Sequence, residues 1–255
     1  MPRSSYGYVD FQPYIMPTSS GMLAFISQQV NRWNGLHVLD TACGNGALAQ
    51  ELVNQEAIVV ALEAEPTLVY RADENSLRAG NRKRPRFLVG GPHDLPRNEK
   101  DFHMILCLNN AVSVLDNAAK LAAFLDQTVA MLLPRGRLVM QLYNYDRILD
   151  FHDYHLEDIH HPEWGLSIYR SLAPDGKEGL ILTNKIDICR SDAMERSVRR
   201  SYLWPVRRLQ LANMCREAGY TTIQVFADLN GSAWQADSYS TILIAIRDEA
   251  GGSMT

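Results

Sequence analysis

The sequence predicts an α/β fold in which helices cover both faces of a mostly parallel, doubly wound sheet. Short apolar runs, typical of buried strands, alternate with segments of helical periodicity. The first of these strands ends in a glycine-rich turn that leads directly into a helix. The chain has 255 residues and is 46% hydrophobic, which is enough for one large core, or for one core with an appended lid.

The glycine-rich turn follows the apolar run 37–39 and precedes a helical pattern over 47–53. Gly44 and Gly46 can take backbone angles closed to other residues, and without a Cβ they let a ligand lie against the main chain. Unpaired N–H groups at the start of the helix favour a carboxylate or phosphate at the same place. We therefore predict a ligand cradle. Its expected contact residues are Asp40, Ala42, Cys43, Gly44 and Gly46.

Two kinds of cofactor fit such a turn. The segment 44–49 satisfies the glycine fingerprint of NAD-binding enzymes. A second strand, 58–62, ends at Glu63, where an acid accepts hydrogen bonds from the ribose of either NAD or S-adenosylmethionine. Asp40 distinguishes the two, because a carboxylate suits the ammonium group of S-adenosylmethionine and would repel a pyrophosphate.

The stretch from Val38 to Gly46 resembles the opening motif of the class I S-adenosylmethionine-dependent methyltransferases, roughly V-L-D-x-x-C-G-x-G, at every fixed position. The resemblance covers about residues 37–149 and 205–247. It implies a Rossmann-like sheet of seven strands with the last strand antiparallel, and S-adenosylmethionine as cofactor. The closing helix, strand, turn and strand over 206–246 are similar to the family's ending, whereas an NAD-binding domain would continue in parallel units.

The adenine contact departs from the family pattern. After a third strand, 87–89, many members carry G-D-x-x-x-L-P, whose acid reads the adenine amino group; here Gly91 stands at the acid's position. The contact is therefore expected from the backbone, from His93 or from Asp94. The cofactor contacts expected beyond the cradle are Tyr14, Glu63, Ala64, Gly91, Pro92, His93, Leu108 and Asn109.

A fourth strand, 102–108, is followed by Asn109 and Asn110. Ligands of open parallel sheets bind at the carboxyl ends of the strands, so both side chains are expected to line the cleft. A plain asparagine turn is the alternative interpretation.

A fifth strand, 138–143, runs into Asn144-Tyr145-Asp146, which is similar to the N-Y-D-x-I motif of the glycine and sarcosine N-methyltransferase group. In that group an arginine precedes the motif and is thought to clamp the substrate carboxylate. Tyr143 stands at the matching position, so a bidentate carboxylate grip is lost, and we infer a related small-molecule enzyme whose substrate is not glycine. The expected substrate contacts are Asn110, Tyr143, Asn144, Tyr145 and Trp204.

The segment 151–204 interrupts the alternation of strands and helices, and its three alternating runs predict an antiparallel lid that selects the acceptor. Histidines and acids over 152–163 fit no standard metal-ligand spacing, so a solvated, partly disordered lid is favoured over a metal site. Five arginines near the lid's end favour an outer charged face over an anion clamp: Arg196, Arg199, Arg200, Arg207 and Arg208.

The predicted domains are an N-terminal flap and helix (1–36), a cofactor-binding domain (37–150 and 205–248), an inserted substrate lid (151–204) and a flexible tail (249–255).

Methyl transfer from a sulfonium needs a nucleophile held in line behind the methyl carbon, and no catalytic nucleophile from the protein. An amine acceptor must arrive uncharged or lose its proton to solvent or to a base, for which Tyr143, His152 and His155 are the candidates. We therefore expect a methyltransferase that acts on a small-molecule nitrogen rather than on oxygen or carbon.

The charge of the chain argues against a nucleic-acid partner. The formal net charge is -4 and the pI is about 6.0, whereas phosphate binding normally needs a basic face. A nucleic-acid methyltransferase is further disfavoured because no N-P-P-Y or D-P-P-Y motif follows Leu108. A non-catalytic S-adenosylmethionine sensor or scaffold stays open, because Gly91 replaces the expected acid.

The cysteines and the absence of a targeting segment bear on where the protein is located. The four cysteines lack metal spacing and predict buried, reduced thiols in a cytoplasmic protein. No signal peptide or membrane-length apolar run is visible. The sequence leaves the oligomeric state open.

Overall fold

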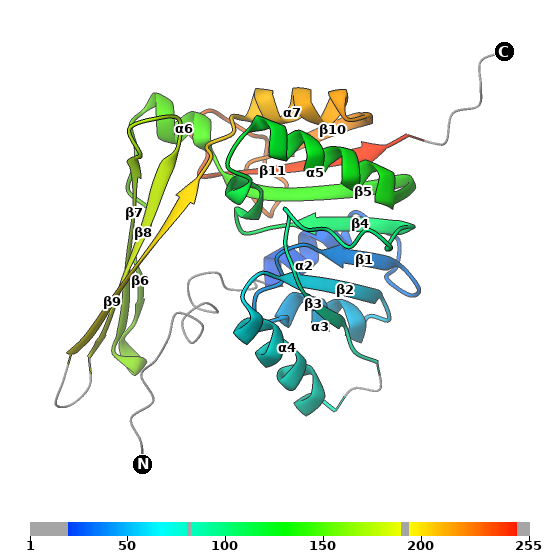
Figure 1. Cartoon of the computed structure of the whole chain (residues 1–255), viewed down its shortest axis with the longest axis horizontal. Coiled ribbons are helices and arrows are strands. Elements are labelled where there is room, and N and C mark those ends of the chain that lie inside the picture. The colour runs from blue at the N-terminus through cyan, green and yellow to red at the C-terminus, as the bar shows by residue number, and fades with distance from the viewer. Residues whose placement is uncertain (1–19, 81–82, 190–193, 249–255) are drawn as a thin grey trace.

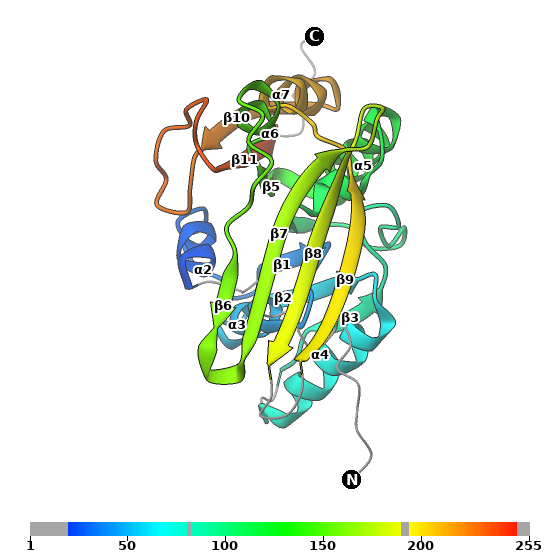
Figure 2. The ribbon, with the colours of Figure 1, turned by 90° about the vertical axis from the view of Figure 1, so that its left-hand side faces the viewer.

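The computed structural model describes residues 20–80, 83–189 and 194–248. These residues form a seven-stranded sheet and a separate four-stranded sheet. The small sheet stands as a second layer in front of the strand ends of the large one (Figures 1 and 2). Tyr14, with the rest of the predicted flap before residue 20, and the tail 249–255 lie outside the described residues.

The large sheet has the strand order β10-β11-β5-β4-β1-β2-β3. The strands β1 to β5 are parallel, and β11 runs antiparallel to both of its neighbours. The predicted Rossmann-like sheet with an antiparallel last strand is therefore confirmed. Its strands are β1 (His37–Asp40), β2 (Ile58–Glu63), β3 (Arg86–Val89), β4 (Phe102–Cys107), β5 (Leu132–Tyr143), β10 (Tyr220–Phe226) and β11 (Ser240–Arg247).

Helices pack on both faces of this sheet. On one face, α2 and α3 contribute Phe25 and Leu52 to a buried cluster that includes Val38 of β1. On the other, α5 contributes Phe124 to a second cluster that includes Leu39, the next residue of the same strand. Successive residues of β1 thus face opposite cores, which gives the doubly wound arrangement. The helices are α2 (Ser20–Ser27), α3 (Ala47–Asn54), α4 (Pro66–Arg78), α5 (Ala118–Met131), α6 (Tyr145–Asp150), α7 (Arg208–Glu217) and the short 3-10 turn η1 (Ala111–Val114).

The small sheet is antiparallel, in the order β6-β7-β8-β9, and we call it the lid. The tight turn between β7 and β8 is closed by Asp175, whose Oδ1 accepts hydrogen bonds from the backbone N–H groups of Lys177 (2.8 Å) and Gly179 (3.0 Å). Its strands are β6 (Ile159–His161), β7 (Leu166–Pro174), β8 (Leu180–Cys189) and β9 (Met194–Leu203).

Part of the histidine-rich stretch is more regular than we expected. Residues 159–161 form the strand β6 instead of a partly disordered segment. Ile159 packs against the buried cluster of Leu166, Ile168 and Ile186, and this burial holds the strand on the lid. Across the described ranges, no three His, Cys, Asp or Glu side chains are grouped so that they could hold a metal ion.

One strand boundary differs from the sequence expectation. The fifth strand begins at Leu132, directly after α5, rather than at residue 138. Residues 133–136 form a bulge in it, with Arg135 at φ 62°, and regular pairing with β4 resumes at Arg137. Asn117 caps α5, because its extended backbone lets its side chain accept from the N–H of Lys120.

The cysteine prediction is wrong for one of the four thiols. Cys43, Cys107 and Cys215 are buried and free, whereas Cys189 is exposed at the end of β8. As for the membrane, no helix within the described ranges combines the length and the apolar character needed to cross a bilayer.

Candidate active site

Two adjoining cavities lie between the carboxyl ends of the large sheet's strands and the lid. We call the first, of about 370 Å³, the cradle cavity; Ala42, Glu63 and lid residues of β8 and β9 line it. We call the second, of about 380 Å³, the side cavity; it lies against β5, α6 and β7. Asn109, Asn110 and Tyr143 line both, so the two cavities meet at the ends of β4 and β5. The cradle cavity lies where the strand order reverses, between the ends of β1 and β4, which is the usual ligand site of open α/β sheets.

The cradle is strongly acidic. Asp40, at the end of β1, is 3% exposed, and its Oδ1 accepts a hydrogen bond from the N–H of Ala42 at 3.1 Å. Burial raises the pKa of Asp40 to about 7, and the nearby carboxylate of Glu63 adds to the shift. Within the described residues no cationic side chain pairs with either acid. The pair therefore fits a ligand that brings a positive charge, such as the amino-acid end of S-adenosylmethionine, and not a pyrophosphate.

Glu63 also holds the glycine-rich turn in place. Its Oε2 accepts from the N–H of Gly44 at 3.1 Å, and its Oε1 accepts from the N–H of Glu65 at 2.9 Å. The acid predicted to read a ribose thus already shapes the loop on which the ligand would lie.

Gly46 is required by packing as much as by the ligand. It has φ +78°, and a Cβ there would come within 2.7 Å of the Phe87 ring and 2.9 Å of Ala72 Cβ. The turn can lie this close to β3 and α4 only because this residue has no side chain.

The three residues expected near the adenine, Gly91, Pro92 and His93, line the cradle cavity. Asp94 does not line it, and its backbone N–H closes the turn by donating to the carbonyl of Gly91 at 2.9 Å. Of the three sources considered for the adenine contact, backbone, His93 and Asp94, the structure brings the first two to the cavity.

At the junction of the cavities, Asn109 and Asn110 adopt left-handed backbone angles, φ 54° and 64°. Asparagine tolerates this region better than most residues. The Oδ1 atom of Asn110 accepts from the N–H of Tyr143 (3.2 Å), the hydroxyl of Tyr145 (2.9 Å) and Ser113 Oγ (3.1 Å). Both asparagines therefore make the tight turn and line the cleft.

An arginine side chain from the lid contacts Tyr143. The Nη2 of Arg170, on β7, donates to the Tyr143 hydroxyl at 2.7 Å. A guanidinium is therefore present beside Tyr143, although none precedes the N-Y-D motif in the sequence. The expectation that this place lacks a cation is wrong, because the lid supplies one across 27 residues of sequence.

The N-Y-D segment itself lines neither cavity. Asn144 is 0% exposed; its Oδ1 caps α6, and its Nδ2 donates to the carbonyls of Ala236 (3.0 Å) and Ser238 (2.9 Å). Tyr145 is buried in the network around Asn110, with burial raising the pKa of its hydroxyl. These two predicted substrate contacts instead hold the end of β5 and the loop before β11.

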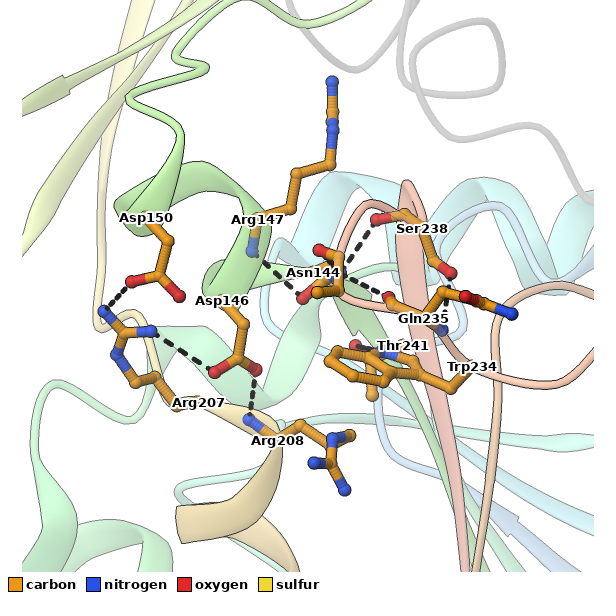
Figure 3. A network of polar contacts seen from close by, with 11 residues as sticks. Asn144, Asp146, Arg147, Asp150, Arg207, Arg208, Trp234, Gln235, Ser238 and Thr241 are labelled. Atoms are coloured by element: carbon orange, nitrogen blue, oxygen red, sulfur yellow. Dashed lines mark hydrogen bonds and ion pairs between the residues drawn. The ribbon is translucent and has the colours of Figure 1, made fainter.

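Asp146 completes this network at the base of the lid (Figure 3). It accepts from the backbone N–H of Arg208 (2.9 Å) and from Arg207 Nη1 (3.3 Å), while Arg207 Nη2 donates to Asp150 at 2.8 Å. Arg208 stacks over the Trp234 ring at 4.3 Å. These contacts join α6, where the chain leaves for the lid, to the start of α7, where it returns, so Arg207 and Arg208 do not form the outer charged face that we expected.

The remaining predicted residues differ in whether they line a cavity. Leu108 and Ala64 line the cradle cavity, and His155 lines the side cavity. His152 lies outside both cavities, and Trp204 is 8% exposed and packs in the core. Four predicted cradle contacts are buried and do not line the cradle cavity: Asp40, Cys43, Gly44 and Gly46.

Sequence reasoning missed two contributions of the lid, Arg170 and Asn184, and it placed Arg199 on an outer charged face, whereas Arg199 lines the cradle cavity. A signal was present, because Arg170 and Asn184 interrupt apolar residues that recur at every second position of β7 and β8. Residues on one face of a strand alternate, so both polar side chains had to point the same way as Ile168 and Leu182.

Comparison with known proteins agrees with this geometry. Residues 38–136 match the family model described as a methyltransferase domain. A solved S-adenosylmethionine-dependent methyltransferase from Clostridium acetobutylicum ATCC 824 superimposes with a TM-score of 0.79 at 12% identity, over 93% of this chain and 96% of that one. The structure of S-adenosylmethionine-bound CalS10, an amino pentose methyltransferase from Micromonospora echinaspora, gives 0.66 at 15% identity, over 97% and 99%. The chain therefore contains a methyltransferase domain over residues 38–136, and it has the fold of the solved S-adenosylmethionine-dependent methyltransferases.

Two relatives are similar in sequence. A glycine/sarcosine N-methyltransferase from Halorhodospira halochloris is 25% identical over 232 residues, which are 88% of this chain and 80% of that protein. A ubiquinone biosynthesis O-methyltransferase from Xylella fastidiosa (strain M23) is 31% identical over 123 residues, which are 48% of this chain and 47% of that protein.

Proposed function

We propose that this methyltransferase acts on the nitrogen of a small-molecule amine, by in-line methyl transfer. The observation that carries the proposal is the meeting of the two cavities at Asn109, Asn110 and Tyr143. When bound in the cradle, S-adenosylmethionine supplies an electrophilic methyl group on a sulfonium. A nucleophile held in the side cavity would face that methyl across the junction.

On the cofactor side, Asp40 would accept hydrogen bonds from the ligand's ammonium group, and Glu63 from its ribose. Gly91, Pro92 and His93 would enclose the adenine, while Leu108 and Asn109 would support the middle of the ligand. Ala42 and Ala64 also line this cavity. We keep Tyr14 as a proposed contact from the flap.

On the acceptor side, the chain's task is to hold the nucleophile, because orientation alone supplies roughly 7 to 11 kcal/mol in well-aligned systems. The side cavity of about 380 Å³ suits a small molecule. Tyr143 and His155 line it and are the proposed proton acceptors, whereas His152 is less suited because it lies outside.

Nitrogen is favoured over oxygen because the longer sequence match, over 88% of this chain, is to a protein named as a glycine/sarcosine N-methyltransferase. The solved relatives include an amino pentose methyltransferase and a sugar N-methyltransferase. We further propose that the segment 151–204 selects the acceptor, that nucleic acid is not the substrate, and that the protein works in the cytoplasm.

Incubation with methyl-labelled S-adenosylmethionine and matched panels of amines, phenols and carboxylic acids tests the proposal. We expect label to appear in amines. Transfer only to phenols or acids would contradict the choice of nitrogen. Label that stays bound but unreacted with every panel would favour the alternative, a non-catalytic sensor or scaffold, and methylated RNA would favour a nucleic-acid enzyme.

A further inference from the structure

A row of three polar side chains crosses the inner face of the lid. Arg170 on β7 pairs in register with Asn184 on β8, and Asn184 pairs with Arg199 on β9. Arg170 lines the side cavity, while Asn184 and Arg199 line the cradle cavity. We call these three residues the polar row. In Figure 2 the three lid strands lie side by side in front of the large sheet's strand ends.

Two atoms of the polar row are buried without a partner. Asn184 is 3% exposed, and its Oδ1 has no hydrogen-bond partner among the described residues. The Nε of Arg170 is also buried and unpartnered, and no described carboxylate forms an ion pair with this guanidinium. Leaving a buried polar group unpaired costs about 1 to 3 kcal/mol, and more when the group is charged. A bound molecule that presents an anion and an N–H or O–H group would satisfy both atoms.

The other charged residues that line the side cavity do not neutralise the Arg170 guanidinium. Arg147 is already paired with Asp153. Glu157 and His155 line the cavity but are exposed to solvent. Arg170 is therefore the partly buried cation that faces the cavity without a counter-ion among the described residues.

The polar row also lies close to the site of transfer. Arg170 Nη2 donates to the hydroxyl of Tyr143, and Tyr143 stands at the junction of the two cavities. An anion bound to the remaining N–H groups of this guanidinium would lie one side chain away from the junction. Such an anion would fix the orientation of the acceptor's nucleophile.

We propose that the polar row selects an acceptor that carries an anionic group beside its nucleophilic nitrogen. Arg170 binds the anion, a carboxylate in the first instance, in the side cavity, and Asn184 Oδ1 accepts an N–H of the acceptor where the acceptor reaches past the junction into the cradle cavity. This inference rests on the proposed function for the nitrogen, but the anion site itself can be measured without turnover.

The first test measures anion binding to the protein saturated with S-adenosylhomocysteine, by calorimetry or NMR, with acetate, methanesulfonate and inorganic phosphate as probes. We expect acetate to bind and its affinity to fall at least tenfold in Arg170→Gln, with partial recovery in Arg170→Lys. Tighter binding of phosphate than of acetate would assign the site to phosphorylated acceptors and overturn the choice of carboxylate. The absence of binding, or equal binding in Arg170→Gln, would overturn the anion site.

Arg200→Gln is the matched control, because Arg200 is exposed on β9 and lines neither cavity. It removes one lid arginine and should leave acetate binding unchanged. Equal weakening in Arg200→Gln and Arg170→Gln would show a general charge effect and contradict the proposal.

The second test compares turnover of paired amines that differ only in a carboxylate, such as ethylamine and β-alanine. We expect the wild-type protein to prefer the acid-bearing partner, and Arg170→Gln to raise the KM of that partner at least tenfold with less change in kcat. If neither amine is methylated while acetate still binds through Arg170, the proposed nitrogen chemistry fails and the anion site stands.

Asn184→Leu separates recognition from structure. The leucine has nearly the same volume and removes the unpaired oxygen, so we expect an equal or higher Tm together with a raised acceptor KM. A lower Tm with an unchanged KM would mean that Asn184 only supports the lid, and would overturn its place in the proposal.

Discussion

Asp40 couples cofactor affinity to pH in a way that can be measured directly. Burial holds its pKa at about 7, whereas an aspartate in an unfolded chain titrates near about 3.9. Only the ionised carboxylate pairs well with an ammonium group, so affinity for S-adenosylhomocysteine should fall by about tenfold for each pH unit below 7. At pH 5 the affinity should therefore be roughly 100-fold weaker than at pH 8, a difference of about 3 kcal/mol.

The same shift predicts an opposite effect on the ligand-free fold. The folded state holds the Asp40 proton more tightly than the unfolded state, so Asp40 contributes most favourably below about pH 4, and this contribution is lost as the pH rises towards 7. The loss amounts to roughly 4 kcal/mol above pH 7, at about 1.4 kcal/mol for each pH unit between the pKa of the unfolded and of the folded state. Asp40→Asn should thus stabilise the ligand-free protein at pH 8 and not at pH 4, while it weakens cofactor binding at least tenfold at pH 8.

The assay is calorimetric titration with S-adenosylhomocysteine between pH 5 and 8, together with unfolding curves of both proteins over the same range and down to pH 4. In Asp40→Asn the affinity for S-adenosylhomocysteine should hardly change with pH. The pH dependence of the wild-type protein would then come from the Asp40 carboxylate. A flat profile in the wild-type protein, or equal affinity in Asp40→Asn at pH 8, would refute the assignment of Asp40 to the ammonium group. Heat of binding with NADH and none with S-adenosylhomocysteine would refute the assignment of the cradle to S-adenosylmethionine.

Three other substitutions test separate parts of the site. Asn144→Ala removes the cap of α6 and several donations to the loop before β11, so it should lower the free energy of unfolding by about 2 to 4 kcal/mol; a fully stable variant with a raised acceptor KM would restore a substrate contact. Gly46→Ala puts a Cβ at 2.7 Å from the Phe87 ring with φ +78° and should cost about 2 kcal/mol or more in denaturant unfolding, whereas an unchanged midpoint would show that the turn relaxes freely. Tyr143→Phe removes the hydroxyl that accepts from Arg170, so steady-state kinetics should show lower kcat/KM for the acceptor with cofactor affinity within about twofold; a larger loss of cofactor affinity would contradict the position of Tyr143 at the junction.

The large sheet could be predicted from the sequence because its determinants are local. Apolar runs, the glycine-rich turn and the proline at the start of α4 each act over a few residues, and the structure agrees with them. The start of β5 could not be predicted in the same way. Pro134 and Gly136 read as a turn, and Arg135 between them has φ 62°. The chain keeps this local bend as a bulge, because Leu132 pairs with Phe102 and Arg137 with Met104 while residues 133–136 have no partner in the sheet.

In the candidate site, too, the locally determined parts could be predicted from the sequence, and the parts that depend on tertiary packing could not. Asp40, Glu63 and the glycines belong to one motif whose backbone geometry is set locally, and the structure brings these acids together. Asn144 and Tyr145 were assigned to the substrate because of the resemblance of their segment to the N-Y-D-x-I motif, but their side chains turn inward and satisfy buried partners. Arg170 reaches Tyr143 only because the lid folds back over the strand ends, and a contact of this kind depends on how two sheets are placed rather than on either segment alone.

The clasp formed by Asp146, Asp150 and Arg207 has a consequence for how such an enzyme can diversify. The chain departs from the cofactor-binding body and rejoins it at neighbouring points, and this clasp fixes both of them. The four strands between these points behave as a cassette. New loop lengths and new inward-facing side chains can be installed there while the geometry that grips the methyl donor is left intact, so acceptor choice and donor chemistry become separately adjustable traits of one polypeptide.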